Sequence, residues 1–170
     1  DVVFTKGPFQ DANITDTTLT PSTHTTGTGR TLTASAVTGI NGGSGFLSTD
    51  IGRQFYMNSG YGVITGVNST TEAVITIDTA MANSNAITAW QLGSFSNTTG
   101  FPACVTFFEQ RLVFAGTTNQ PQTVFFSKSG DYENMDANIG GNVADSDAII
   151  YTIASNQVNA IRFMTATRTL

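Results

Sequence analysis

Acidic side chains placed close together in the chain are the first features that could do chemistry. Asp131 and Glu133 lie on either side of Tyr132, Asp145 and Asp147 precede an apolar run, and Glu109 lies two residues before Arg111. Glycoside hydrolysis uses two carboxylates about 5 to 10 Å apart across a cleft. A cell-envelope hydrolase using Glu109 or Asp131 is therefore one hypothesis. The alternative is that these are solvated turn residues, with Glu109 and Arg111 able to form a surface ion pair.

A segment rich in oxygen-bearing side chains, residues 136–142 with Asp147 beyond it, has some features of a calcium-binding loop. The glycine is misplaced, an Asp stands where a bidentate Glu is expected, and flanking helices are not predicted. A plain insertion between strands explains the same residues. We therefore predict no metal site. Residues 39–45 (GINGGSG) contain no Lys and no following helix, so they predict a loose turn rather than a phosphate-binding loop.

Nucleophilic and metal-binding side chains are scarce, because the chain has one cysteine and one histidine. Cys104 stands among apolar residues, which favours a buried thiol over a reactive one. His24 stands in a Thr- and Ser-rich run, which favours a solvated loop. Neither a zinc site nor a Cys-His catalytic pair can be assembled from these two residues. We predict no catalytic, cofactor-binding or metal residues, no cofactor and no enzymatic activity.

Aromatic side chains suggest a different class of function. Trp90, Tyr56 and Tyr61 could form a platform on which a sugar ring stacks, and Asn-rich turns accompany them. A carbohydrate-binding or adhesion module of a phage or bacterial surface is thus the alternative hypothesis. Burial of Trp90 in a core is the competing interpretation.

Composition restricts the fold. Only 11% of the 170 residues are charged, and Thr, Ser, Asn and Gly supply most of the polarity, which favours β-structure. Short apolar runs separated by turn residues predict a series of strands. They lie at residues 2–5, 30–36, 53–57, 62–67, 73–78, 87–92, 104–108, 112–115, 122–127, 148–154 and 158–166.

Local patterns add detail to this series of strands. A polar tip at residues 68–71 predicts a hairpin between its neighbouring runs, and residues 48–51 predict a single helical turn. Residues 155–157 predict a second hairpin between the last two strands. That hairpin leaves an unpaired apolar edge, so we expect a partner or further sequence to complete the sheet.

The fold class that follows is all-β, with a small six-stranded type of β-barrel joined to, or inserted into, an antiparallel sheet domain. The expected division is an N-terminal strand over residues 1–14 that packs with the C-terminal sheet, a barrel over 15–94 and the sheet over 95–170.

The net charge is −5 and the seven basic residues are scattered, so nucleic-acid binding is not expected. No run approaches the about 20 apolar residues of a membrane-spanning helix, so membrane insertion is not expected.

Five short motifs lie along the first part of the chain: GPF at 7–9, LTPS at 19–22, RTLTAS at 30–35, DIGR at 50–53 and WQLGSFS at 90–96. The more specific segments follow at residues 102–116, 120–122 with 127–134, and 147–149 with 154–161. Together these segments resemble a family of bacteriophage tail structural proteins, the nozzle or tail-tube proteins of short-tailed phages and prophages.

The resemblance implies a barrel similar in shape to the first catalytic cysteine half-domain of ubiquitin-activating enzymes, and a propeller-like sheet that continues beyond residue 170. It also implies a non-enzymatic virion protein, made in the bacterial cytoplasm. Such a protein assembles with copies of itself, as a homo-oligomeric ring, and with neighbouring tail proteins.

Overall fold

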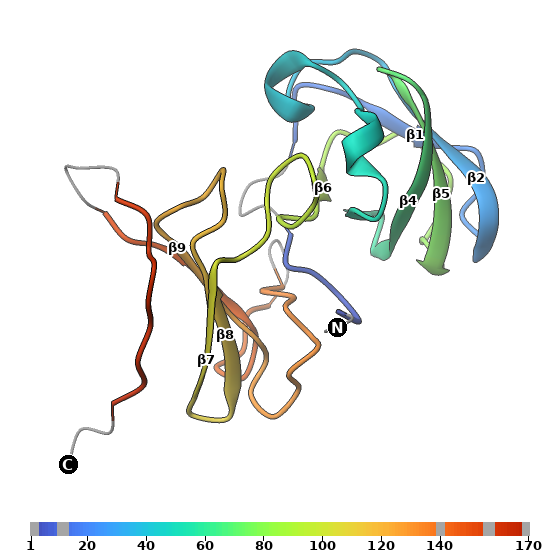
Figure 1. Cartoon of the computed structure of the whole chain (residues 1–170). Coiled ribbons are helices and arrows are strands. Elements are labelled where there is room, and N and C mark those ends of the chain that lie inside the picture. The colour runs from blue at the N-terminus through green and yellow to red at the C-terminus, as the bar shows by residue number, and fades with distance from the viewer. Residues whose placement is uncertain (1–3, 10–13, 139–141, 155–158, 168–170) are drawn as a thin grey trace. The chain divides into compact units, whose positions relative to one another are not determined.

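The computed structural model describes residues 4–9, 14–138, 142–154 and 159–167, and it divides into two compact units (Figure 1). The barrel unit comprises residues 9–98, and the sheet unit comprises residues 1–8 with 99–170. Regular structure in the described residues consists of strands and two single-turn 3-10 helices, η1 (Asn41–Gly43) and η2 (Ser48–Asp50). The prediction of an all-β fold is confirmed, and no described helix is long and apolar enough to cross a membrane.

The barrel unit is one six-stranded antiparallel sheet curved into a half-barrel, in the order β1-β2-β5-β4-β3-β6. Its strands are β1 (Leu19–Pro21), β2 (Gly27–Ala34), β3 (Gln54–Met57), β4 (Gly60–Ser69), β5 (Glu72–Thr79) and β6 (Trp90–Leu92). Five of these overlap predicted strands. The predicted hairpin with a polar tip is formed by β4 and β5. The short strand β1 was not among the predicted strands.

Alternation along the barrel strands decides which side chains enter the core. In β5, Ala73, Ile75 and Ile77 are buried and the residues between them are more exposed, as a strand with one buried face requires. Fifteen buried residues from all six strands and the turns form one apolar cluster.

The predicted helical turn is η2, a 3-10 turn, and the carboxylate of Asp50 accepts the Leu47 backbone N–H at 2.9 Å.

The two edges of the barrel sheet are joined to each other by backbone hydrogen bonds. Leu19 in β1 exchanges N–H···O bonds of 2.8 and 3.0 Å with Ile87, and Ile14 donates to the Trp90 carbonyl in β6 at 2.7 Å. Phe9, at the start of the unit, forms an isolated bridge with Gly93, which follows β6. The backbone groups of both edge strands are therefore partly used within the unit itself.

The sheet unit contains four antiparallel strands in the order β10-β9-β8-β7, and these confirm the predicted antiparallel sheet. They are β7 (Cys104–Phe108), β8 (Arg111–Ala115), β9 (Thr123–Phe126) and β10 (Ile149–Thr152). Glu109 and Gln110 form the two-residue turn between β7 and β8, both with positive φ, as a type I′ turn requires. All four overlap strands that the sequence pattern predicted, at residues 104–108, 112–115, 122–127 and 148–154.

The register of the sheet unit defines two faces. The Phe125 face carries the row Val105, Phe114, Phe125 and Ile150, and the Phe126 face carries the row Thr106, Val113, Phe126 and Ile149. Phe4 packs edge-on against Phe114 with ring centroids 5.6 Å apart, so the N-terminal segment covers part of the Phe125 face.

The C-terminal segment differs from the prediction. A strand over residues 158–166 in a hairpin with 148–154 is wrong, because residues 159–167 have no strand pairing; residues 155–158 lie outside the described chain. Instead, Ile161 donates its N–H to the Pro121 carbonyl at 2.9 Å, and residues 164–166 lie against the Phe126 face. Apolar alternation alone does not distinguish a strand that pairs from an extended segment that crosses a sheet face. The predicted strand at 2–5 is likewise absent from its described residues, Phe4 and Thr5.

Candidate functional site

The carboxylates singled out from the sequence lie in turns of the sheet unit. Glu109 is exposed at the tip of the β7–β8 hairpin, and Asp131 is exposed in a turn that begins at Lys128. Arg111 does not form the ion pair with Glu109 that the sequence had suggested. Its guanidinium donates to the carbonyl oxygens of Ser127, Asp147 and Asp145 at 2.6 to 2.7 Å. Arg111 therefore anchors the loop after β9 to the start of β8.

The acidic loop that resembled a calcium site is neutralised by lysines. Lys128 Nζ lies 2.7 Å from an Asp147 carboxylate oxygen, and Lys6 forms an ion pair with Asp136. The second Asp147 oxygen accepts the Ala144 N–H at 2.9 Å. This backbone bond, followed by the Lys128 contact, lowers the pKa of Asp147, and Asp147 in turn raises the pKa of Lys128. Among the described residues no group of three or more His, Cys, Asp or Glu side chains is arranged to hold a metal.

Cys104 and His24 lie in different units. Cys104 is half-buried on the Phe126 face, where its thiol lies 3.6 Å from the Ala115 carbonyl, and desolvation by burial raises its pKa. A raised pKa reduces the thiolate fraction, so this thiol is a poor nucleophile. His24 is exposed between β1 and β2, as the sequence predicted.

The structure removes Trp90 from the aromatic platform that was predicted for stacking against a sugar ring. Trp90 is fully buried, and its indole Nε1–H donates to the Thr17 carbonyl at 2.8 Å, so its role is in the barrel core. Tyr56 and Tyr61 are half-buried and lie opposite each other on β3 and β4. Phe9 packs against Tyr56 with ring centroids 5.6 Å apart.

A buried polar network in the barrel unit was not predicted from the sequence. Arg53 and Asp50 form an ion pair of 3.0 Å with both side chains fully buried. Asn41 contacts both partners: its amide N–H donates to Asp50 at 2.7 Å and its amide oxygen accepts from Arg53 at 2.8 Å. Thr98 also donates to Asp50, at 2.7 Å. All described contacts of this network are internal, so it holds loops and strands together.

The two edge strands of the sheet unit, β7 and β10, expose large apolar side chains. Val105 and Phe107 on β7 are 57% and 62% exposed, and Tyr151 on β10 is 59% exposed. The β7–β8 pairing has no bulge, and β7 contains no Pro, Lys or Glu, the residues that usually block pairing at an edge. Within the described chain no strand pairs with the outer side of β7 or of β10. Two open, apolar edges are thus available in the sheet unit.

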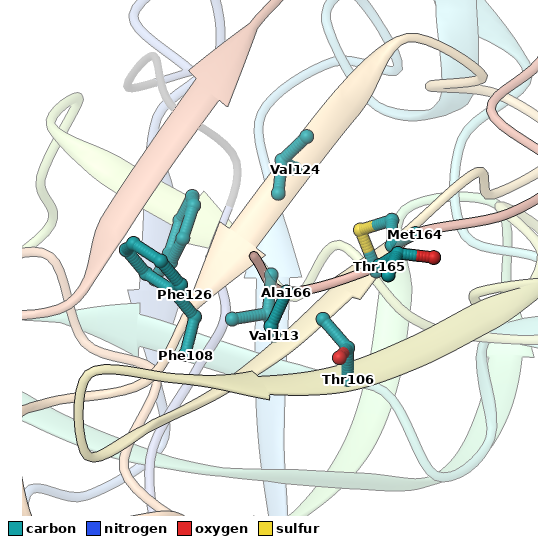
Figure 2. Close-up of a pocket in the computed structure, with 8 residues that line it drawn as sticks. All are labelled: Thr106, Phe108, Val113, Val124, Phe126, Met164, Thr165 and Ala166. Atoms are coloured by element: carbon teal, nitrogen blue, oxygen red, sulfur yellow. The ribbon is translucent and has the colours of Figure 1, made fainter. Parts of the chain in front are cut away.

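An apolar pocket of about 260 Å³ lies on the Phe126 face beside β7 (Figure 2). Its lining comes from β7, β8 and β9 and from the C-terminal segment, and Figure 2 shows these side chains gathered around it. The lining residues are Thr106, Phe108, Val113, Val124, Phe126, Met164, Thr165 and Ala166. None of these side chains carries a charge, so the pocket suits an apolar group.

No protein-family model matches this chain, and no curated protein is similar to it at a significant level.

Proposed function

We propose that this chain is a non-enzymatic structural component of a bacteriophage or prophage tail, in a nozzle or tail tube, where it associates with copies of itself and with neighbouring tail proteins. The observation that carries the proposal is the pair of open, apolar sheet edges on β7 and β10. The segments that resemble tail proteins include β7 and β8 and flank β9 and β10, at residues 102–116, 120–122 with 127–134, and 147–149 with 154–161. The location that follows is the virion, after synthesis in the bacterial cytoplasm.

The geometry of an even-stranded antiparallel sheet supports association of this kind. Because neighbouring strands alternate in direction, β7 and β10 run antiparallel to each other at opposite edges. When a second copy is placed in the same orientation beside the first, its β10 is antiparallel to β7. Such a head-to-tail contact repeats from copy to copy and closes into a ring if the rotation between copies allows it.

The charge of the chain fits a part that DNA passes without binding. A net charge of −5 with scattered basic residues disfavours attraction to phosphate groups. The few charges also make subunit contacts depend little on ionic strength, because exposed ion pairs contribute at most about 1 kcal/mol.

The alternative was a carbohydrate-binding or adhesion module. Trp90 was the main candidate for stacking against a sugar ring in such a module, and it cannot do so because it is fully buried. Tyr56 and Tyr61 are half-buried, so no observation favours this alternative over assembly.

The test is the mass of the full chain in solution, measured by light scattering over a range of concentrations. We expect masses that are multiples of 17.9 kDa for the unmodified protein. Val105→Lys places a charge on the β7 edge and should shift the protein toward the monomer. Val143→Lys is the matched control, since Val143 is 69% exposed but lies in a loop of the same unit. A monomer at every concentration would contradict the proposal.

A further inference from the structure

One Asn-Gly pair occurs in the sequence, Asn41–Gly42, and it lies in the η1 turn of the barrel unit. Asparagine is chemically labile, and it is most labile before glycine, because no side chain there hinders attack by the following backbone nitrogen. The turn nonetheless favours glycine at this position, since Gly42 has φ 65°, a left-handed conformation that glycine adopts readily. The geometry of the turn therefore places a labile pair in the barrel.

The two halves of this pair have different surroundings. Gly42 is exposed, and a Cβ added to it would meet no atom within 4 Å outside its own turn. The half-buried Asn41 side chain is held by three hydrogen bonds. Its amide N–H groups donate to the Gly45 carbonyl at 2.9 Å and to Asp50 at 2.7 Å, and its amide oxygen accepts from Arg53 at 2.8 Å. A carboxamide fixed in this way cannot rotate freely toward the Gly42 nitrogen.

We propose that Asn41 is a self-modification site, which reacts with the Gly42 backbone nitrogen when the η1 turn opens and stays unreacted while the Asp50–Arg53 pair holds it. Local opening of a surface turn costs less than global unfolding, so the turn opens in molecules that are otherwise folded. The site lies in the barrel unit, and its chemistry does not depend on self-assembly.

The reaction needs only water and a solvent base. The Gly42 nitrogen loses its proton to solvent and attacks Cγ of Asn41. The N–Cγ bond forms, the Cγ–Nδ2 bond breaks, and Nδ2 leaves as ammonia with a proton taken from water. Water then opens the cyclic imide at either of its two carbonyls. The products are aspartate and isoaspartate, in which the backbone runs through Cγ, and nothing is oxidised or reduced.

Neither product fits the network that holds Asn41. In aspartate an oxygen replaces Nδ2, so an acceptor would face two other acceptors, the Gly45 carbonyl and the Asp50 carboxylate. Arg53 donates from one nitrogen to both Asn41 and Asp50, and its single charge cannot neutralise two carboxylates. Isoaspartate also lengthens the backbone of the turn. A turn that has opened and reacted therefore cannot close as before.

The experiment follows the reaction in the full chain by mass spectrometry, in folded protein and in urea at the same mildly alkaline pH. Trypsin releases residues 31–53, between Arg30 and Arg53, and Asn41 is the only Asn or Gln in that peptide. We expect the peptide to gain the mass of an amide-to-acid change about tenfold or more slowly in folded protein, because only transiently opened molecules react. Isoaspartate should accompany aspartate, since the imide opens at both carbonyls. An equal rate in folded protein and in urea would overturn the inference.

A variant beside the site tests whether the network controls the reaction. Thr98 donates to Asp50 at 2.7 Å, so Thr98→Val loosens the network without touching Asn41. Its folded-state rate should rise about fivefold, the equivalent of one hydrogen bond, while its rate in urea stays unchanged. Thr65→Val is the matched control, since Thr65 is exposed on β4 of the same unit. Equal folded-state rates in the two variants would show that the network does not protect Asn41.

A mimic of the product tests the consequence for the fold. Asn41→Asp should lower the urea midpoint of the barrel unit, because it brings a second carboxylate to Asp50. Asn97→Asp makes the same change at an exposed position of that unit and should leave the midpoint nearly unchanged. Equal midpoints for these two variants would refute the claim that the reacted turn cannot close.

Discussion

The guanidinium of Arg53 lies 3.0 Å from the carboxylate of Asp50, and both groups are fully buried in the barrel unit. Arg53 also donates through Nε to the Gly93 carbonyl at 2.7 Å, beside the end of β6. Desolvation lowers the pKa of Arg53, and the charge of Asp50 opposes that effect. The pair therefore joins the η2 turn to the last strand of the barrel.

Removing one partner of this ion pair should destabilise the barrel strongly. Asp50→Asn leaves the Arg53 charge buried without its counter-charge, which costs about 3 to 5 kcal/mol of unfolding free energy. The double variant Asp50→Asn/Arg53→Met should lose less than the sum of the two single losses. Urea unfolding followed by Trp90 fluorescence reports on this unit directly. Asp16 is exposed, so the control variant Asp16→Asn should change the unfolding free energy little. Equal losses in Asp50→Asn and Asp16→Asn would show that the ion pair is not important for stability.

Two glycines of β4 should differ in how much stability their replacement by alanine costs. A Cβ on Gly62 would lie 2.0 Å from the Thr76 carbonyl oxygen in β5, so Gly62→Ala must displace the backbone and should cost about 2 kcal/mol or more. A Cβ on Gly66 would lie 3.4 Å from the nearest atom, the Val74 Cβ. Gly66→Ala should stay within about 1 kcal/mol of the unmodified protein. The same urea unfolding measurement tests both variants, and a loss of stability in Gly66→Ala as large as in Gly62→Ala would refute this account.

The β7–β8 turn should be stabilised by glycine at its second position. Gln110 has φ 60°, a left-handed conformation that costs a non-glycine residue about 1 kcal/mol or more. Gln110→Gly should therefore raise the unfolding free energy of the sheet unit by up to about 1 kcal/mol. Gln110→Ala keeps the strained backbone and should give no gain. Thermal unfolding followed by circular dichroism compares the variants, and an equal gain in both would exclude backbone strain as the cause.

The ion pair of Asp147 and Lys128 should make stability depend on pH at the acid end. The pKa of Asp147 is lowered in the folded protein, so its contribution is complete above the unfolded-state pKa of about 3.9 and is lost as the pH falls through the folded-state pKa. The pKa of Lys128 is raised, so its contribution is lost only as the pH rises through that raised value. The stability difference between the unmodified protein and Asp147→Asn should thus be largest near neutral pH and shrink below about pH 4.

Urea unfolding at pH 7, 5 and 3 measures this difference. Asp145→Asn removes the same charge from the same loop without removing a described side-chain contact, and it serves as the control. A difference for Asp147→Asn that stays constant from pH 7 to pH 3 would be inconsistent with the ion pair.

The strands could be predicted from the sequence where turn residues flank an apolar run on both sides. The β7 run, Cys104–Phe108, is bounded by Pro102 and by the Glu109–Gln110 turn, and its predicted limits agree with the structure. The segment after residue 158 carries the same alternation, but its pairing depends on a partner strand that local sequence does not specify. The short strand β1 has too few residues to show any periodicity.

The functional surface was harder to predict than the fold, because it depends on exposure. Trp90 and Phe107 are both aromatic residues in strands, yet the first is fully buried and the second is mostly exposed. Only the strand order places β7 at an edge. The Arg53–Asp50 pair had a faint signal in the sequence, since opposite charges three residues apart stand in a region with few other charges.

The bridge between Phe9 and Gly93 has a consequence for how the protein can change through evolution. The chain enters and leaves the barrel unit at neighbouring points. Two closely spaced segments therefore connect this unit to the rest of the chain. Insertions of this kind can be lengthened, shortened or exchanged without moving the ends of the segment that carries them. The barrel unit is therefore the part of the chain whose length can change with the least effect on the four-stranded sheet.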